Sequence, residues 1–392
     1  MSILEGLLGL SPWQVAITGL IAVQITILSI TLYLHRHSAH NALELHPVLS
    51  HFFRFWLWLT TGQNTREWTA IHRKHHARCE TDEDPHSPVA KGIWTVLSRG
   101  YELYKAAATP ETLERYGKGT PDDWIERNVY SRYPTLGVVL LLGIDLLLFG
   151  VYGITLWAVQ MLWVPIHAAG IINGLGHWVG YRNFETADNA RNLIPWGLWI
   201  GGEELHNNHH AYPNSARLSV KRWEVDIGWL WIRLFQMLGL ARPRFVAPVA
   251  TYVPGRTELT EDTLAAIHNH RYEILARFRK QVYAPMVKQR LRQLSSEHVG
   301  APLRRLKKQL LSFREVPDPV LVAPVLESDR VLDTLWQARQ ALLDIWMNRK
   351  MGYKAKLEAL HAWCQQAEAS GVETLEEFVV WMKGYTLSPR TA

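Results

Sequence analysis

The sequence predicts an all-α integral membrane protein with about three transmembrane helices, a cytosolic helical cap that holds a histidine-rich site for two metal ions, and a C-terminal helical extension. Two observations lead to this prediction. Long apolar stretches occur at residues 11–34 and 135–176, and three histidine motifs lie close to the ends of such stretches. We expect two domains, a membrane domain at residues 1–245 and a basic helical extension at residues 246–392.

The two apolar stretches differ in length. Residues 11–34 carry no charged side chain, and at about 1.5 Å per helical residue they can cross a hydrocarbon core of about 30 Å. Residues 135–176 are long enough for two crossings joined by a turn near Gly150 and Gly153. This second stretch contains Asp145, which is either a functional residue or a packing residue that a polar partner satisfies.

The apolar segment at residues 48–62 is short and contains Arg54, so we expect it to be interfacial or re-entrant. If the three histidine motifs share one site, an even number of crossings must separate each motif from the next. No crossing between the first two motifs and two crossings before the third satisfy this condition. Basic residues follow the first span, whereas only Glu5 precedes it, so the positive-inside rule places the motifs in the cytoplasm.

The C-terminal extension is strongly basic near its start. Residues 241–315 contain 15 Lys and Arg against 6 Asp and Glu. Basic amphipathic helices beside a membrane either bind anionic lipid headgroups or simply present a solvated face, and both interpretations stay open here. The basic region contains no motif that recognises a nucleic-acid groove, so we do not expect nucleic-acid binding.

Histidine spacing predicts where the rings converge. The three motifs consist of His35, His37 and His40, of His72, His75 and His76, and of His206, His209 and His210. Residues three and four apart share a helix face, so the rings within the second motif should converge, and likewise those within the third. The first span can end at the first motif and let His35 and His40 turn inward. Asn173 and His177, four residues apart, should face the same site.

These side chains indicate a site for two metal ions. Neutral imidazole is a ligand for Zn, Cu, Fe and Ni. The candidate ligands are nine histidines and one amide: His35, His40, His72, His75, His76, His177, His206, His209, His210 and Asn173. Nine histidines without a cysteine exceed the coordination of one ion, so two metals explain them. Iron is favoured, because open coordination positions beside imidazole suit oxygen chemistry.

Ligating imidazoles usually donate their second N–H to a carboxylate. The candidate carboxylates are Asp82, Asp84, Glu203 and Glu204. His37 lies two residues from His35 and should face away, and His167 is predicted to pack in the core. The other histidines lack partners at ligand spacing and are interpreted as ordinary residues: His46, His51, His86, His268, His270, His298 and His361.

The three motifs, in this order and with their flanking residues, resemble the membrane fatty-acid desaturase family in its acyl-CoA and acyl-lipid Δ9-desaturase-like branch. The similarity extends over residues 10–240 and includes Gln63 with Asn64, Glu67 with Trp68, Asp82 to His86, Asn173 to His177, and Gly202 to His206. The resemblance implies a non-haem diiron centre. One iron would take His35, His40 and part of the other two motifs, and the second iron would take the remainder with His177. Asn173 would act through a water molecule.

The resemblance also implies an activity and its partners. We expect an O2-dependent fatty-acyl desaturase that introduces a cis double bond, at Δ9, into a saturated chain linked to CoA or to a phospholipid. The implied partners are O2, membrane lipid and a separate electron donor such as a ferredoxin with its reductase. The implied location is a bacterial inner membrane, with the active site on the cytoplasmic face. The residues expected to contact the substrate are Gln63, Asn64, Trp68, Ala169 and Gly170.

Two departures from the family pattern concern the substrate. Ala70 and Ile71 stand where acyl-CoA enzymes often have an Arg-Asp pair near the CoA head group, which admits a phospholipid substrate. Ala169 and Gly170 stand where those enzymes tend to have Thr-Trp at the bend of the acyl tunnel, which leaves the position of the double bond open. The alternatives are a related diiron membrane hydroxylase or monooxygenase, and a non-catalytic membrane metal binder or transporter.

Overall fold

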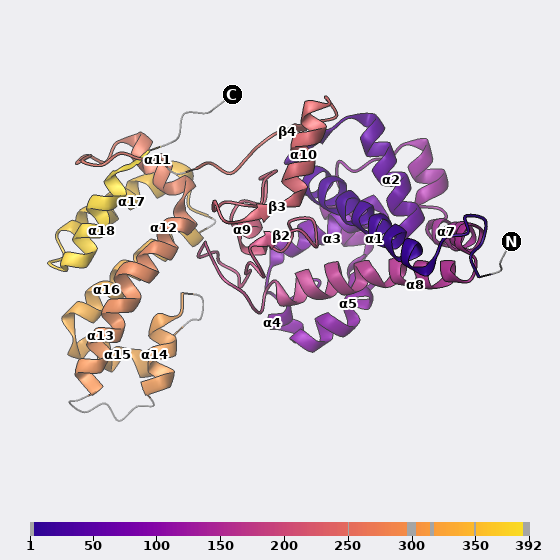
Figure 1. Ribbon diagram of the computed structural model, residues 1–392. Coiled ribbons are helices and arrows are strands. Elements are labelled where there is room, and N and C mark those ends of the chain that lie inside the picture. Colours follow the sequence, from indigo (N-terminus) through magenta and orange to yellow (C-terminus); the bar gives the residue numbers. More distant parts are fainter. Residues whose placement is uncertain (1–3, 250, 296–302, 314–316, 349, 387–392) are drawn as a thin grey trace. The chain divides into compact units, whose positions relative to one another are not determined.

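The computed structural model describes residues 4–249, 251–295, 303–313, 317–348 and 350–386 (Figure 1). The chain forms two compact units. The first unit comprises residues 1–182 and 188–247, and the second comprises residues 183–187 and 248–392. His298 lies outside the described residues.

The first unit is mostly helical, as the sequence predicts. Its helices are α1 (Pro12–Ser29), η1 (Ile30–Ala39), α2 (Pro47–Thr61), α3 (Thr65–Arg78), α4 (Pro88–Lys91), α5 (Ile93–Ala107), α6 (Pro110–Tyr116), η2 (Glu126–Tyr130), α7 (Pro134–Phe149), α8 (Tyr152–Val164), η3 (Pro165–Leu175), α9 (His206–Ala211) and α10 (Ile227–Met237), where η denotes a π-helix. Two short strand pairs join distant segments. Strand β1 (Leu43–Leu45) pairs antiparallel with β4 (Ala241–Pro243), and β2 (Trp196–Gly197) pairs parallel with β3 (Val225–Asp226).

Two continuous helical stretches in the described chain are long and apolar enough to cross a membrane. These are α1 with η1 (Pro12–Ala39) and α8 with η3 (Tyr152–Leu175). Helix α7 is also apolar but has 16 residues. Large apolar side chains on these helices are exposed, among them Ile17, Leu140 and Leu162, which is the surface expected where lipid replaces water. Both apolar stretches are therefore helical, and the number of crossings stays a prediction.

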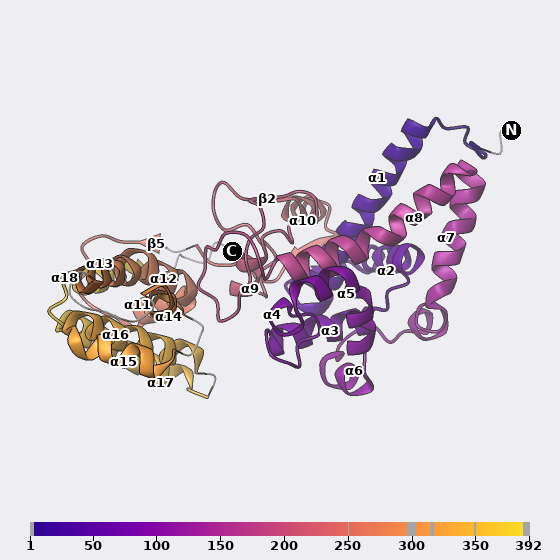
Figure 2. The ribbon, with the colours of Figure 1, turned by 90° about the horizontal axis from the view of Figure 1, so that it is seen from below.

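Helices α7 and α8 form an antiparallel hairpin, and α1 lies against α8 (Figure 2). Gly150 turns the chain with a φ of 61°, a conformation that favours glycine. Gly153 allows the two helices to approach, because a Cβ there would lie 2.1 Å from the carbonyl oxygen of Asp145. The carboxylate of Asp145 is buried and accepts a hydrogen bond of 3.0 Å from the Gln160 amide. The acid thus has a polar partner within the hairpin.

The short segment between the first two motifs forms α2. Its Arg54 is buried, and the guanidinium donates hydrogen bonds to Asp123 at 3.0 Å and to Glu126 at 2.8 Å. The hydrogen bond from Arg54 lowers the pKa of Asp123 to about 2. These two carboxylates explain how an apolar helix accommodates a buried arginine. Whether α2 lies at a membrane surface stays a prediction.

The second unit is a helical assembly with its own hydrophobic core. Its elements are β5 (Thr251–Tyr252), α11 (Glu261–Asn269), α12 (Arg271–Arg277), η4 (Phe278–Tyr283), α13 (Ala284–Ser295), α14 (Leu303–Leu311), α15 (Pro319–Ser328), α16 (Arg330–Met347), α17 (Tyr353–Glu368), α18 (Glu373–Lys383) and β6 (Tyr385–Thr386), with β5 and β6 paired antiparallel. On the basic helix α14, Leu306 and Leu310 are buried in the core, whereas Arg304 and Lys307 are exposed. The apolar side of this helix is therefore used by the core, and its cations face outward.

Candidate metal centre

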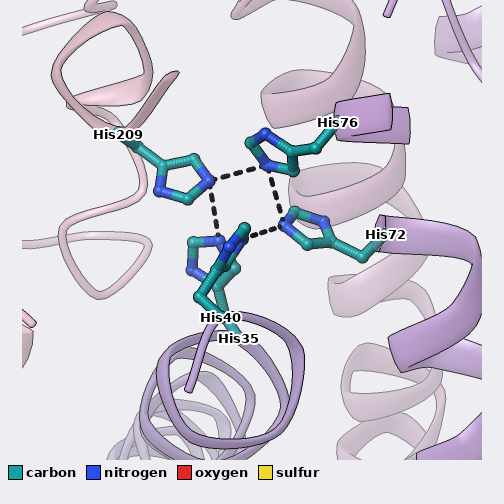
Figure 3. Close-up of side chains that lie close together, drawn as sticks. All are labelled: His35, His40, His72, His76 and His209. Atoms are coloured by element: carbon teal, nitrogen blue, oxygen red, sulfur yellow. Dashed lines mark hydrogen bonds between the residues drawn. The ribbon is translucent and has the colours of Figure 1, made fainter. Parts of the chain in front are cut away.

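Five histidine side chains form the first histidine cluster (Figure 3). They are His35 from η1, His40 at the C-cap of η1, His72 and His76 from α3, and His209 from α9. Their Nε2 atoms face one another. The distances are 3.1 Å from His35 to His209, 2.8 Å from His40 to His72, and 2.9 Å from His209 to His76. Nitrogen atoms that converge this closely can surround one metal ion.

His35 and His40 meet because the first helix is π-helical over its last turns, before it ends at the first motif. Helix α1 continues as η1, and the N–H of His40 bonds the carbonyl of His35, five residues earlier, at 3.1 Å. In a π-helix, residues five apart lie one above the other, and the centroids of the two rings are 4.9 Å apart. As expected, the helix ends within the first motif, at Ala39. Its last, π-helical turn brings the two rings together.

The second histidine cluster consists of His75, His177, His206 and His210, all of them buried. The Nε2 atoms of His177 and His206 lie 3.0 Å apart. Helices α3 and α9 each contribute to both clusters, because adjacent positions on a helix point to different sides. Spacing alone predicts that the rings of each motif share one site, whereas the resemblance implies that the second and third motifs divide their rings between two ions. The second and third motifs divide their rings between two sites, which together hold all nine predicted histidines.

Two of the four predicted carboxylates bond cluster histidines. A carboxylate oxygen of Glu203 lies 2.8 Å from Nδ1 of His35, and one of Asp84 lies 3.0 Å from Nδ1 of His75. Burial raises the pKa of both carboxyl groups, but the lowering effect of the adjacent histidine and of their other partners is larger. Each pKa therefore lies below its ordinary value. A carboxylate that accepts the Nδ1–H leaves the Nε2 lone pair for a metal.

The other two predicted carboxylates lie away from the rings. Asp82 is exposed. Glu204 accepts hydrogen bonds from the backbone N–H groups of Trp199 at 2.8 Å and Ile200 at 2.7 Å. Glu204 therefore fixes the loop that precedes the third motif.

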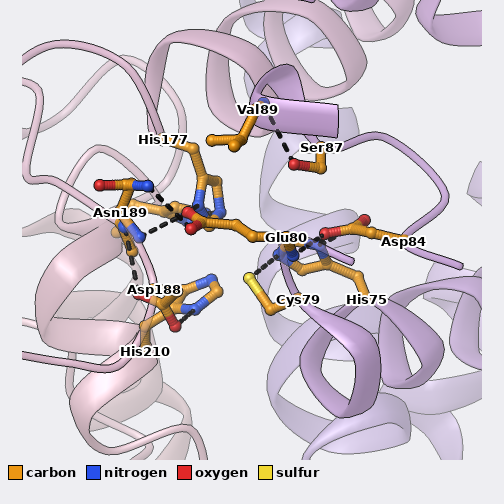
Figure 4. Close-up of polar contacts among 12 residues, drawn as sticks. His75, Cys79, Glu80, Asp84, Ser87, Val89, His177, Asp188, Asn189 and His210 are labelled. Atoms are coloured by element: carbon orange, nitrogen blue, oxygen red, sulfur yellow. Dashed lines mark hydrogen bonds and ion pairs between the residues drawn. The ribbon is translucent and has the colours of Figure 1, made fainter. Parts of the chain in front are cut away.

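Two carboxylates beside the second cluster are not among those that the sequence predicts (Figure 4). Asp188 lies 2.8 Å from Nδ1 of His210, and Glu80 lies 3.4 Å from Nδ1 of His177. Asp188 belongs to a loop without a recognisable motif, so only the tertiary structure reveals it. Cys79 also lies beside this cluster, with its Sγ 4.0 Å from Nε2 of His75.

The electrostatics of both clusters suit metal binding. Burial lowers the pKa of His72, His76 and His209 well below its ordinary value, and the neighbouring rings lower it further. Burial likewise lowers the pKa of His210 to about 4, although Asp188 opposes this effect. These four rings are therefore neutral near pH 7. The buried Nε2 of His210 has no hydrogen-bond partner within the described chain. Converging neutral imidazoles fit a pair of transition-metal ions.

Three further histidines have defined contacts. The Nδ1–H of His37 donates to a backbone carbonyl in β1 at 2.8 Å, and that of His167 donates to the carbonyl of Trp163 at 2.9 Å. Both rings thus have partners outside the clusters. His86 belongs to neither histidine cluster. It is buried, and its ring centroid lies 4.4 Å from that of His75.

A cavity of about 580 Å³ reaches the clusters. The polar residues of interest in its wall are His35, His72, His86, His206 and Glu203, and four residues predicted from the sequence also line it, namely Gln63, Trp68, Ala169 and Asn173. The ring of Trp68 stacks on His72, with 13° between their planes and 4.9 Å between their centroids. Ligand cavities commonly have this size.

Asn64 and Gly170 have structural roles instead. The side chain of Asn64 caps α3 by accepting hydrogen bonds from backbone N–H groups of its first turn at 2.8 and 3.0 Å. Gly170 packs against α5, since a Cβ there would lie 3.3 Å from the carbonyl oxygen of Leu97. A Cβ on Gly100 of α5 would lie 2.9 Å from the Cβ of Ala169. Because the residues at positions 169 and 170 are small, α5 can pack closely against them and form part of the cavity wall.

Comparison with known families identifies the class of protein that this fold and site define. Residues 11–239 match the fatty acid desaturase family, and the chain belongs to that family. It is therefore an oxidoreductase that acts as a desaturase. The match ends before the main segment of the second unit, which begins at residue 248.

Individual relatives support this conclusion. The chain is 31% identical to delta-9 acyl-lipid desaturase 1 of Arabidopsis thaliana over 233 residues, which are 58% of this chain and 74% of the relative. It is 32% identical to an sn-1 stearoyl-lipid 9-desaturase of Anabaena variabilis over 216 residues, 55% of this chain and 77% of the relative. It is also 31% identical to an acyl-CoA 5-desaturase of Anemone leveillei over 215 residues, 54% of this chain and 65% of the relative. The predicted family is confirmed.

Proposed function

We propose that this protein is an O2-dependent fatty-acyl desaturase that uses two non-haem iron ions to introduce a cis double bond, at Δ9, into a saturated acyl chain. The observation that carries the proposal is that a cavity of ligand size reaches two clusters of converging histidines. An apolar chain that enters this cavity would come to lie beside the metal ions. The names of the relatives, which specify position 9 in two cases, support the position of the double bond.

The proposed ligands are the nine clustered histidines. His35, His40, His72, His76 and His209 would hold one ion, and His75, His177, His206 and His210 the other, with Asn173 acting through a water molecule. Iron, when bound, supplies the oxidising chemistry that removes two hydrogens from an unactivated chain with O2 and two external electrons. The carboxylates of Asp84, Glu203 and Asp188 orient their histidines, and the buried walls exclude water from the reaction.

The carrier of the acyl chain is a phospholipid or CoA. Glu67 and Lys105 form an ion pair at 3.3 Å, line the cavity and are partly exposed. Such a polar, accessible part of the wall suits the head-group end of a substrate. The relatives named for acyl lipids support a phospholipid, and the relative named for acyl-CoA supports CoA.

We further propose the setting of the reaction. Helices α1 with η1, α7, and α8 with η3 cross a bacterial inner membrane, and the histidine clusters face the cytoplasm. The basic residues that follow the first span support this orientation. A separate electron donor, such as a ferredoxin with its reductase, reaches the site from the cytoplasm. Residues 1–245 act as the desaturase domain, and residues 246–392 form a basic helical extension.

Expression in a desaturase-deficient bacterial host tests the proposal. With iron and an electron donor supplied, lipid mass spectrometry with double-bond localisation should detect new Δ9 double bonds, and the His209→Ala variant should yield none. Products that gain an oxygen atom would instead identify a hydroxylase. Bound metal without any modified lipid would favour a non-catalytic metal binder.

A further inference from the structure

Cys79 carries a thiol beside the second histidine cluster that the proposed ligand set does not include. The residue follows α3 directly and lies four positions after His75, and side chains four apart share one face of a helix. Its Sγ atom is 4.0 Å from Nε2 of His75. Because Nδ1 of that ring bonds Asp84, Nε2 is the nitrogen that is left for a metal. The helix therefore directs the thiol to the metal-binding side of the His75 ring.

The Sγ atom is also close to two other rings of the second cluster. It lies within 4.8 Å of a potential ligand atom of His177 and of His210. Figure 4 shows the Cys79 side chain between His75 and His210. The thiol thus lies beside three of the four histidines of this cluster, which come from different segments of the chain.

His210 provides an independent indication that a ligand belongs at this place. Its side chain is 1% exposed, and its Nε2 atom has no hydrogen-bond partner among the described residues. The Nδ1 atom already bonds Asp188 at 2.8 Å, so Nε2 is the nitrogen that lacks a partner. A buried nitrogen of this kind requires an explanation, and a bound metal ion supplies one.

The spacing between the thiol and the His75 ring fits one shared ion. Ligand atoms that bind one ion at about 2.1 Å for nitrogen and about 2.3 Å for sulfur lie at most about 4.4 Å apart. The distance of 4.0 Å between Sγ of Cys79 and Nε2 of His75 is within this limit. One ion can therefore bind both atoms where they lie.

The loop after α3 holds Cys79 in place. Its next residue, Glu80, has a φ of 61°, a left-handed conformation that residues other than glycine rarely adopt. The carboxylate of Glu80 accepts a hydrogen bond of 2.8 Å from the Asn189 side-chain amide, and its backbone N–H donates to Asp84 at 2.8 Å. Such a backbone conformation persists only where surrounding contacts impose it, and it is common at functional sites. The loop that orients His75 through Asp84 thus also fixes the thiol.

From these contacts we propose that the Cys79 thiol is a further ligand of the ion that the second histidine cluster holds. The sulfur binds as a thiolate, so the S–H bond breaks, a metal–sulfur bond forms and the proton passes to water. Thiolate is a softer ligand than imidazole, so the two clusters should differ in the ions that they prefer. The inference rests on the proposed function only in placing an ion in the second cluster.

Substitution with Co(II) tests the inference, because a thiolate bound to Co(II) gives an intense charge-transfer absorption in the near ultraviolet that imidazole and carboxylate ligands do not give. The purified native protein, loaded with Co(II) and freed of excess metal, should show this band. Cys79→Ser should lose it. Absence of the band from native protein that retains two Co(II) ions, or its persistence in Cys79→Ser, would overturn the inference. Folded protein that retains no ion in the second cluster would overturn it as well.

The second cysteine of the chain supplies the matched control. The chain contains two cysteines, and Cys364 is buried in the core of the second unit. Cys364→Ala should therefore keep the band at its native intensity. If Cys79→Ser does not fold, this variant still decides the assignment, because Cys79 is then the only thiol. Loss of the band from folded Cys364→Ala would assign it to the wrong cysteine and overturn the inference.

Metal retention gives a second readout. In a graded chelator series, Cys79→Ser should lose one Co(II) ion per chain at a chelator concentration about tenfold lower than the native protein does, because a ligand of that ion is missing. Cys364→Ala should match the native protein. Equal retention in Cys79→Ser and native protein would contradict a ligand role.

The expression test of desaturation distinguishes failure of this inference from failure of the proposed function. Double bonds formed in cells by a protein whose cobalt form lacks the band would refute the thiolate ligand and leave desaturation intact. The band without double bonds in cells would refute desaturation and leave the thiolate ligand intact.

Discussion

The Nδ1 atom of His75 lies 3.0 Å from a carboxylate oxygen of Asp84, and both side chains are buried. Asp84 also accepts the backbone N–H groups of Glu80 at 2.8 Å and His86 at 3.1 Å. One carboxylate therefore fixes a histidine of the second cluster and the loop that follows α3. Partners of this kind orient a ligating ring and fix its tautomer.

The first prediction compares Asp84 with Asp82, two residues away. Asp84→Ala should weaken iron binding by about 10–100-fold, because His75 loses the acceptor that orients it. Asp82→Ala should leave iron binding unchanged, because Asp82 is exposed. Iron retained during dialysis against a graded chelator series measures both variants. Equal losses in the two variants would show that Asp84 does not act through His75.

The second prediction separates ligands from neighbours within the histidine motifs. His209→Ala should reduce the bound iron to one ion per chain or fewer and abolish activity, because this ring belongs to the first cluster. His37→Ala should retain both ions, because the His37 ring donates to a backbone carbonyl at 2.8 Å instead. Metal analysis of the purified variants decides the matter. Loss of iron from His37→Ala would mean that the ligand set is wrong.

The third prediction concerns the packing of the hairpin. Gly153→Ala should lower the melting temperature, because the new Cβ would lie 2.1 Å from a backbone oxygen and the helices must separate, at a cost of about 1–3 kcal/mol. Gly143→Ala, on α7, meets no atom within 4 Å and should leave the melting temperature unchanged or raise it. Thermal unfolding in detergent tests the pair. Similar behaviour of both variants would argue against the close approach of α7 and α8.

The fourth prediction concerns the pH dependence of the second unit. Asp329 caps α16 and accepts a hydrogen bond of 2.6 Å from Arg290. Burial raises the pKa of Asp329, but Arg290 and the capped N–H groups together lower it by more. The pKa in the folded state is therefore below the ordinary value of about 3.9. The stabilisation is therefore present above about pH 4 and is lost as the pH falls below it.

Asp329→Asn keeps a capping side chain but removes the charge. The difference in melting temperature between native protein and this variant should be largest near pH 7 and should shrink below about pH 4. Asp329→Ala should lower stability by about 1–3 kcal/mol, because it removes the cap and the bond to Arg290 together. A difference that does not change with pH would exclude the ionised carboxylate as the cause.

Local spacing was sufficient to predict which histidines gather, but it could not predict how they divide. An α-helical period places His72, His75 and His76 on one face, whereas the structure turns His75 to a separate cluster. The meeting of His35 and His40 depends on a π-helix, whose hydrogen bonds do not follow from residue propensities. The apolar stretches were predictable because length and composition alone determine them.

Contacts between segments that are distant in the sequence could not be predicted from local patterns. Asp188 reaches His210 across 22 residues, and no motif marks that loop. The small residues at Ala169 and Gly170 suggested an altered tunnel bend, but only the structure reveals that α5 packs against them. Asn64 looked like a substrate contact because it belongs to a family motif, yet its side chain caps α3.

Iron stoichiometry tests the central claim most directly. Purified native protein, loaded with Fe(II) without oxygen and freed of excess metal, should retain two iron ions per chain when iron and protein are quantified on the same sample. The five-histidine and four-histidine clusters each account for one of these ions. The two-metal site would be contradicted if the protein retained one iron per chain or none while a thermal unfolding transition showed that it was folded.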